Sequence, residues 1–245
     1  MPKTAKYILL FAAVLLASAV CAVLMFRPRA VNIVYMADAR YLPYMMVSLE
    51  SAIAGKNKGT QYHVHIIAKG FAPEDAAKIR KMAQDDVTIE LHSAREPKLD
   101  YARLGRFSSF KISLQKLFIA DYLPSLGKVL YLDADTLVQA DLSEVYETDL
   151  SGKYAAAVKD GLMYQFPEHV AGMDLNGRDF YFNSGVMLLN LAQIRKDGIM
   201  RRAVIYFNTH NEVFGDQDVL NVVFGSKVAV SYTHLRAHET GRNLV

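Results

Sequence analysis

Two aspartates separated by one residue, Asp133 and Asp135, directly follow a short apolar run at residues 129–132. Alternate residues of an extended chain point to the same side, so both carboxylates can face one side while Ala134 faces the other. Paired carboxylate oxygens suit a hard divalent cation such as Mn²⁺ or Mg²⁺, which keeps positions open for water or for the phosphates of a substrate. Taken alone, such a pair is more often a solvated turn or a helix cap, so its context decides.

The sequence around the pair supplies that context, because residues 128–138 read KVLYLDADTLV. This stretch resembles the signature of the family 8 glycosyltransferases, retaining sugar transferases that include lipopolysaccharide galactosyltransferases and glycogenin. In that family the two aspartates bind Mn²⁺ and, through it, the diphosphate of a UDP-sugar. The resemblance implies that Asp133 and Asp135 are metal ligands and that Ala134 lies against the donor.

An earlier segment, residues 31–38, reads VNIVYMAD and resembles the first strand and nucleotide-binding loop of the same family. The resemblance implies that Ala37, Asp38 and Tyr41 contact the nucleotide, with Asp38 near the uridine. The two residues after Asp38 depart from the acidic and amide residues often found there.

A basic residue opens the next motif, at residues 116–124, which read KLFIADYLP. This segment resembles the family segment whose basic residue neutralises the diphosphate or orients an acid, so the resemblance assigns one of these roles to Lys116. Without the neighbouring motifs, the default interpretation is an exposed lysine on a helix.

Two motifs downstream follow the family order. Residues 182–190, FNSGVMLLN, resemble its Asn-x-Gly strand, and residues 216–221, DQDVLN, resemble its Asp-Gln-Asp helix start. Each also has a simpler interpretation, because Gly185 could be a close-packing glycine and Asp216 a helix cap. The joint order of the four motifs favours the family interpretation.

The resemblance implies a complete sugar-transfer site. Asp160, Asn183 and Gly185 would contact the sugars, and Asp216 and Gln217 would lie beside the anomeric carbon as the catalytic pair. Gln217 is a poor nucleophile, which favours same-face attack by the acceptor over a covalent intermediate. The expected reaction is transfer of a hexose from a UDP-sugar to a glycan or lipopolysaccharide-type acceptor; a non-catalytic sugar-nucleotide or partner-binding module is the alternative.

The elements that must position these residues alternate between strands and helices. Apolar runs of strand length occur at residues 31–35, 63–67, 87–91, 128–132, 154–158 and 186–189. Helices are expected at residues 44–54, 73–82 and 113–122, and a long loop at 161–179. This order predicts an α/β fold with a mainly parallel sheet flanked by helices and ligands at the carboxyl ends of its strands. The resemblance implies the mixed, Rossmann-like GT-A type.

Other ligand signals are weak. No Gly-x-Gly-x-x-Gly turn follows the first strand and no Gly-Lys-Ser/Thr phosphate loop occurs, which disfavours a dinucleotide cofactor. His63 and His65 share a strand, but no third ligand stands at a useful spacing, so we expect structural or surface histidines. The net charge of +3 gives no indication of a nucleic-acid partner.

Both ends of the chain are expected to lie outside the globular domain, residues 30–230. Residues 7–26 form an apolar stretch, and a helix needs roughly 20 such residues to cross a bilayer, so residues 1–29 are predicted to be a membrane anchor. A cleaved signal peptide is the alternative. A UDP-sugar donor favours a cytoplasmic catalytic domain in a bacterium, or a Golgi lumenal one in a eukaryote.

Residues 231–245 resemble the translation of a sequencing adapter and are excluded from functional reasoning. Family members continue instead to a His-x-x-Gly-x-x-Lys segment whose histidine completes the Mn²⁺ site. His234 and His238 lack the glycine and lysine of that segment. The chain as written is therefore expected to be impaired in turnover.

Overall fold

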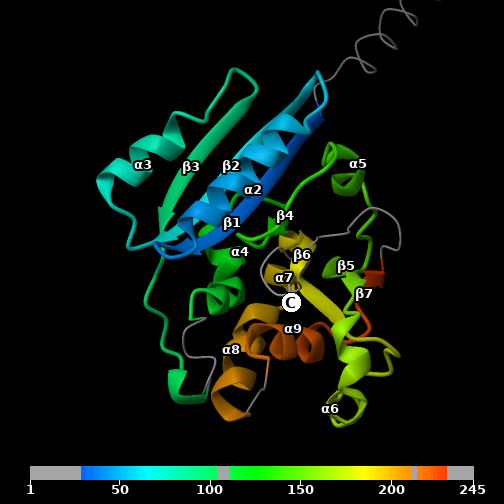
Figure 1. Ribbon diagram of the computed structural model, residues 1–245. Helices are drawn as coiled ribbons and strands as arrows, with labels where there is room; N and C mark the ends of the chain where they lie inside the picture. The colour runs from blue at the N-terminus through cyan, green and yellow to red at the C-terminus, as the bar shows by residue number, and fades with distance from the viewer. Residues whose placement is uncertain (1–28, 104–110, 211–213, 231–245) are drawn as a thin grey trace, which may run out of the picture.

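The computed structural model describes residues 29–103, 111–210 and 214–230 (Figure 1). The predicted membrane anchor and the predicted adapter tail lie outside these residues. Within the described ranges, no helix combines the length and apolar character needed to span a bilayer.

One mixed sheet forms the centre of the described structure, with the strand order β3-β2-β1-β4-β6-β5-β7. The strands are β1 (Arg29–Asp38), β2 (Thr60–Lys69), β3 (Val87–Ser93), β4 (Lys128–Leu132), β5 (Ala155–Lys159), β6 (Phe182–Asn190) and β7 (Val228–Val230). All neighbouring pairs are parallel except those of β6, which runs antiparallel to both β4 and β5. The predicted mainly parallel α/β fold is confirmed, and the start of β6 lies beside the ends of its neighbours.

Helices cover both faces of this sheet, as Figure 1 shows. One face packs against α2 (Leu42–Ala54), α3 (Pro73–Arg80) and α5 (Ser143–Tyr146). The other packs against the 3₁₀ helix η2 (Ser113–Phe118), α4 (Ile119–Tyr122), α7 (Leu191–Lys196), α8 (Ile199–Thr209) and α9 (Asp216–Phe224). Alternate side chains of each strand enter the two cores, so Tyr35 packs with the first group of helices and Val34 with the second.

The expected strands and helices are present, but several elements differ from the expectation. The helix expected at residues 113–122 is divided between η2 and α4. The loop expected at 161–179 contains η3 (Leu162–Gln165) and α6 (Pro167–Ala171). The sequence analysis made no prediction for α5, α7, α8 and β7. Of these, α8 buries Ile199, Ala203 and Phe207, which lie four residues apart on one helical face.

The sequence analysis found no third ligand for His63 and His65, and the structure brings two candidate ligands to His65. In the parallel register of β2 and β3, His65 pairs with Glu90. His92 follows two residues later and therefore points to the same face of the sheet. The partners of His65 come from the next strand, and their spacing in the sequence does not reveal them.

Candidate active site

A cavity of about 400 Å³ lies beyond the carboxyl ends of β1, β4 and β5, at the start of β6 and α9. This volume is in the range of small-molecule sites. Most predicted site residues line it, namely Tyr41, Lys116, Asp133, Ala134, Asp135, Asp160, Asn183, Asp216 and Gln217. Ala37, Asp38 and Gly185 are not among its lining residues, and Ala37 is fully buried.

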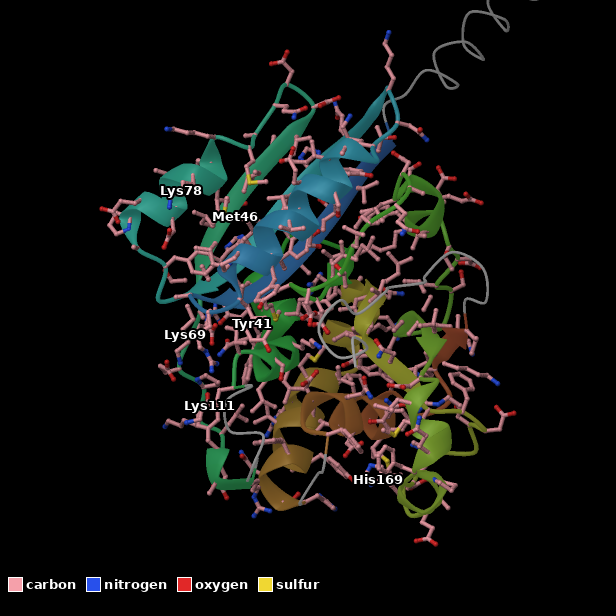
Figure 2. All side chains as sticks on the ribbon, viewed as in Figure 1. Tyr41, Met46, Lys69, Lys78, Lys111 and His169 are labelled. Atoms are coloured by element: carbon pink, nitrogen blue, oxygen red, sulfur yellow. The ribbon has the colours of Figure 1, made fainter. Side chains whose placement is uncertain are left out.

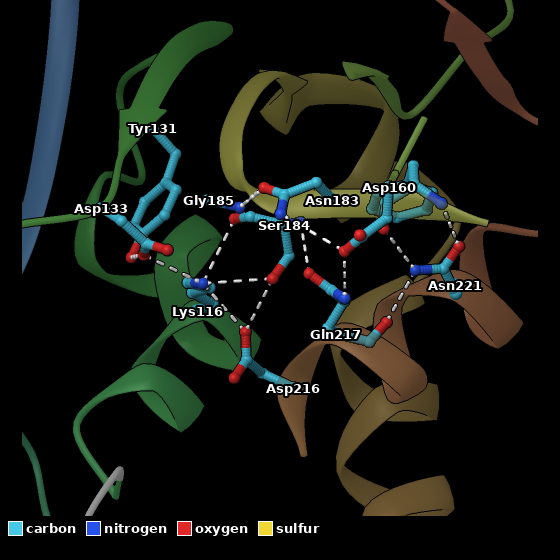
Figure 3. A network of polar contacts seen from close by, with 11 residues as sticks. Lys116, Tyr131, Asp133, Asp160, Asn183, Ser184, Gly185, Asp216, Gln217 and Asn221 are labelled. Atoms are coloured by element: carbon cyan, nitrogen blue, oxygen red, sulfur yellow. Dashed lines mark hydrogen bonds and ion pairs between the residues drawn. The ribbon is translucent and has the colours of Figure 1, made fainter. Parts of the chain in front are cut away.

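Lys116 joins the two acidic motifs across this cavity (Figure 3). Its Nζ lies 3.1 Å from Oδ1 of Asp133 and 2.9 Å from Oδ2 of Asp216, and it donates to the backbone oxygen of Ser184 at 3.2 Å. Burial alone would lower the pKa of the Lys116 amine, but the two carboxylates raise it above its ordinary value. The side chain is 3% exposed, so the interpretation as an exposed helical lysine is wrong. Of the two roles implied by the resemblance, these contacts favour orienting the acids.

Asp216 is not the helix cap that the simpler interpretation suggested. Gly215 occupies the cap position of α9, and Asp216 begins the helix with its side chain 9% exposed against Lys116. A buried carboxylate needs such a partner, because an isolated charge in this environment would be strongly unfavourable.

The Asp133 carboxylate is held by β4 and by a close approach to β6. Its backbone N–H donates to the carbonyl oxygen of Gly185 at 2.7 Å, and Tyr131 donates its hydroxyl proton to Oδ1 at 2.5 Å. A Cβ atom on Gly185 would lie 2.8 Å from Oδ2 of Asp133 and 3.0 Å from Oδ1 of Asn183. A Cβ at this position would therefore have to displace the Asp133 carboxylate.

Replacing Gly185 with Ala is expected to displace the Asp133 carboxylate and weaken divalent-cation binding by roughly tenfold or more, the effect seen when groups that orient ligands are lost. Overpacking should also lower the free energy of unfolding by about 1–3 kcal/mol. Calorimetric Mn²⁺ titration and urea unfolding measure the two effects. Gly127→Ala is the matched control, because a Cβ there meets no atom within 4 Å. Equal Mn²⁺ affinity in both variants would contradict this role of Gly185.

Gln217 is fixed at both ends of its amide. Its Nε2 donates to Oδ2 of Asp160 at 2.9 Å, and its Oε1 accepts from the backbone N–H of Ser184 at 2.9 Å. Asn183 also donates to Oδ2 of Asp160, at 3.3 Å. Asp160 after β5, Asn183 at the start of β6 and Gln217 at the start of α9 thus form one polar cluster along the cavity wall (Figure 3).

Asp38 is paired with Arg40, one of the residues that depart from the family pattern. The Arg40 guanidinium Nη2 lies 2.8 Å from Oδ2 of Asp38, and the backbone N–H groups of Arg40 and Tyr41 donate to Oδ1. Partial burial would raise the pKa of Asp38, but these hydrogen bonds lower it below its ordinary value. Figure 2 shows Tyr41 beyond the end of β1, where it lines the cavity.

Residues 32–230 match the family model described as glycosyl transferase family 8. The chain belongs to this family. Among its relatives, lipopolysaccharide 1,2-glucosyltransferase of Escherichia coli is 30% identical over 204 residues, covering 78% of this chain and 57% of the relative. General stress protein A of Bacillus subtilis is 24% identical, covering 78% of this chain and 68% of the relative. This chain thus spans 57% to 68% of the length of the first three curated relatives that it matches.

Solved structures support the same fold. The apo structure of the bifunctional glycosyltransferase WbbM superposes with a TM-score of 0.68 at 21% identity, covering 83% of this chain and 39% of that one. The galactosyltransferase LgtC, solved in complex with donor and acceptor sugar analogues, superposes with a TM-score of 0.63 at 22% identity, covering 82% of this chain and 73% of that one.

Two residues of the family 8 motif at the start of α9 have structural roles that the sequence analysis did not assign. Asp218 is fully buried and accepts hydrogen bonds from the Tyr181 hydroxyl at 2.5 Å and the Phe214 backbone at 2.9 Å. His169, labelled on α6 in Figure 2, contacts the same carboxylate at 3.0 Å. Asn221 exchanges two hydrogen bonds with the backbone of Phe182. Asp218 and Asn221 lie three residues apart on a predicted helix, so their side chains share one helical face. That spacing was the signal that could have indicated a shared structural role.

The donor set of Asp133 and Asp135 is of a kind that a hard divalent cation can take. Asp133 and Asp135 both line the cavity and offer carboxylate oxygens, the ligands that Mn²⁺ and Mg²⁺ prefer. The Asp133 side chain is 31% exposed, and the absence of a Cβ on Gly185 keeps space beside its Oδ2. Lys116 and Tyr131 both contact Oδ1 and fix the carboxylate from the protein side.

Proposed function

We propose that this chain is the catalytic domain of a retaining glycosyltransferase, which transfers a hexose from a UDP-sugar to a glycan or lipopolysaccharide-type acceptor. The observation that carries the proposal is the Lys116 bridge between Asp133 and Asp216, which couples the acidic pair to the catalytic motif in one cavity. The relative named as a lipopolysaccharide glucosyltransferase and the structure containing donor and acceptor sugar analogues support this substrate class.

Asp133 and Asp135 would hold the Mn²⁺ or Mg²⁺ ion. When bound, the cation supplies Lewis-acid stabilisation of the charge on the departing UDP. Lys116 contributes by keeping the Asp133 carboxylate fixed, through contacts that do not depend on substrate. A preorganised group of this kind needs no rearrangement when charge develops.

Asp160, Asn183 and Gln217 would position the donor sugar. An amide oxygen is a poor nucleophile, and that of Gln217 is held by a hydrogen bond from the Ser184 backbone N–H. The acceptor hydroxyl would therefore attack the anomeric carbon on the face from which UDP departs. The bond from the anomeric carbon to the diphosphate oxygen breaks, the bond to the acceptor oxygen forms, and the acceptor proton leaves with the diphosphate.

The proposal is tested by incubating the protein with UDP-glucose or UDP-galactose, Mn²⁺ and a lipopolysaccharide core oligosaccharide, with product analysis by NMR. Both donors have α-linked sugars, so the expected product is α-linked and forms together with an equal amount of UDP. Chelation of the metal should stop both. A β-linked product would overturn the retaining mechanism, and turnover that continues after chelation would overturn the role of the metal.

A further inference from the structure

A second group of ligand-type side chains lies outside the cavity, on the β2–β3 edge of the sheet. One ligand atom each from His65, Glu90 and His92 lies within 4.8 Å of the others, the only such trio of His, Cys, Asp or Glu among the described residues. His65 comes from β2, and the other two come from the edge strand β3. Their side chains share one face because the two strands are parallel and in register.

For two of the three residue pairs, the distances between these atoms are close to those around a tetrahedral metal ion. Nδ1 of His65 lies 3.2 Å from Nε2 of His92 and 3.4 Å from Oε2 of Glu90, and Nε2 of His92 lies 3.8 Å from Oε1 of Glu90. Metal–ligand bonds of about 2.0–2.1 Å at tetrahedral angles separate neighbouring ligand atoms by about 3.3–3.4 Å. A proton shared between two of these side chains would stabilise only that pair, whereas one metal cation can bind all three side chains.

His65 is largely buried, and its polar contacts with Glu90 and His92 both pass through Nδ1. The side chain is 13% exposed, and its Nε2 is buried without a hydrogen-bond partner among the described residues. Glu90 is 65% exposed, which leaves the cluster open to solvent for entry of an ion.

We propose that His65, Glu90 and His92 form a metal site separate from Asp133 and Asp135, which binds a divalent transition-metal ion of the Zn²⁺ class. Two imidazoles and one carboxylate are typical ligands of such an ion, whereas Mg²⁺ and Mn²⁺ favour oxygen ligands. The bound ion ties β3 to β2 and so protects an edge strand, the part of a sheet most prone to unwanted pairing. This inference does not depend on the transferase activity.

The test is a titration of the untagged full chain with Zn²⁺ by calorimetry and with Co²⁺ by visible absorption. His234 and His238 are first replaced with Gln, because they are further imidazole ligands in the chain. We expect stoichiometric Zn²⁺ binding and a rise in the thermal midpoint, since a ligand that binds only the folded state stabilises it. His92→Gln should weaken Zn²⁺ binding at least about tenfold, because loss of a group that only orients a metal ligand already has an effect of that size. It should also remove the Zn²⁺-dependent rise in the thermal midpoint.

Two controls isolate the site. His63→Gln changes the neighbouring histidine on the same strand, whose Nδ1 contacts Thr88 Oγ1 at 2.9 Å, and should leave Zn²⁺ affinity unchanged. The Asp133→Asn/Asp135→Asn variant should also keep the Zn²⁺ site. No Zn²⁺ or Co²⁺ binding, equal affinity in His92→Gln, or loss of binding in the double aspartate variant would each overturn the proposal. Circular dichroism of every variant verifies that it is folded.

Discussion

Replacing Asp133 with Asn is expected to lower metal-dependent sugar transfer by roughly a thousandfold or more, at the upper end of the effects of removing one charge-stabilising group. Asn has nearly the same shape but no charge, so it is a far weaker ligand for a hard cation. Lys116 retains the Asp216 carboxylate as its partner, so the fold should survive. The measurement is UDP release over a range of Mn²⁺ concentrations, with urea unfolding to verify stability.

Asp149→Asn provides a matched control for this experiment. Asp149 is an exposed aspartate outside the cavity, and its carboxylate accepts a hydrogen bond from the Ser151 backbone at 2.9 Å. Its replacement should leave turnover and Mn²⁺ dependence unchanged. If Asp133→Asn gave the same turnover as Asp149→Asn, the assignment of Asp133 as a metal ligand would have to be abandoned.

Replacing Lys116 with Met is expected to remove activity and to lower the free energy of unfolding by about 3–5 kcal/mol. Breaking one side of a buried ion pair leaves the other charge uncompensated in a poorly solvated position, which is strongly destabilising. Here Asp216 remains 9% exposed without its cation, and Ser184 loses the donor to its carbonyl oxygen. Urea unfolding measures the stability change, and UDP release measures activity.

Two further variants separate the causes of the Lys116→Met effect. Adding Asp216→Asn removes the uncompensated charge, so part of the lost stability should return while activity stays lost. Lys78→Met removes an exposed lysine on α3, which is not among the residues that line the cavity (Figure 2). It should change stability and activity little, because exposed ion pairs contribute little to stability. If Lys116→Met were as stable as Lys78→Met, Lys116 would not be the buried bridge described here.

The local sequence indicated which residues line the cavity, but it did not indicate which of them contact one another. Asp133 could be placed because an apolar run of strand length precedes it and parallel strands bring their carboxyl ends to one edge. The reversal of β6 could not be predicted, because strand direction depends on pairing with distant strands. That reversal brings Asn183 and Ser184 to the cavity at the beginning of their strand. The burial of Lys116 has the same cause, since its partners Asp133 and Ser184 come from distant segments.

The histidine cluster illustrates the same limit. His65 and His92 are 27 residues apart, and only the register between β2 and β3 places them in contact. An alternating His-x-His or Glu-x-His pattern marks residues on one face of a strand but does not reveal which strand lies beside it. Gly185 differs, because its interpretation as a close-packing glycine is confirmed, while the group it packs against, the Asp133 carboxylate, appeared only in three dimensions.

The most direct test of the proposed function is calorimetric titration of the protein with UDP, in the presence and absence of Mn²⁺. We expect UDP binding that requires Mn²⁺, is lost in the Asp133→Asn/Asp135→Asn variant and is retained in Asp149→Asn. UDP binding of equal strength without Mn²⁺, or unchanged in the double variant, would contradict a metal-bridged diphosphate. An absence of UDP binding under all conditions would contradict the sugar-nucleotide site itself.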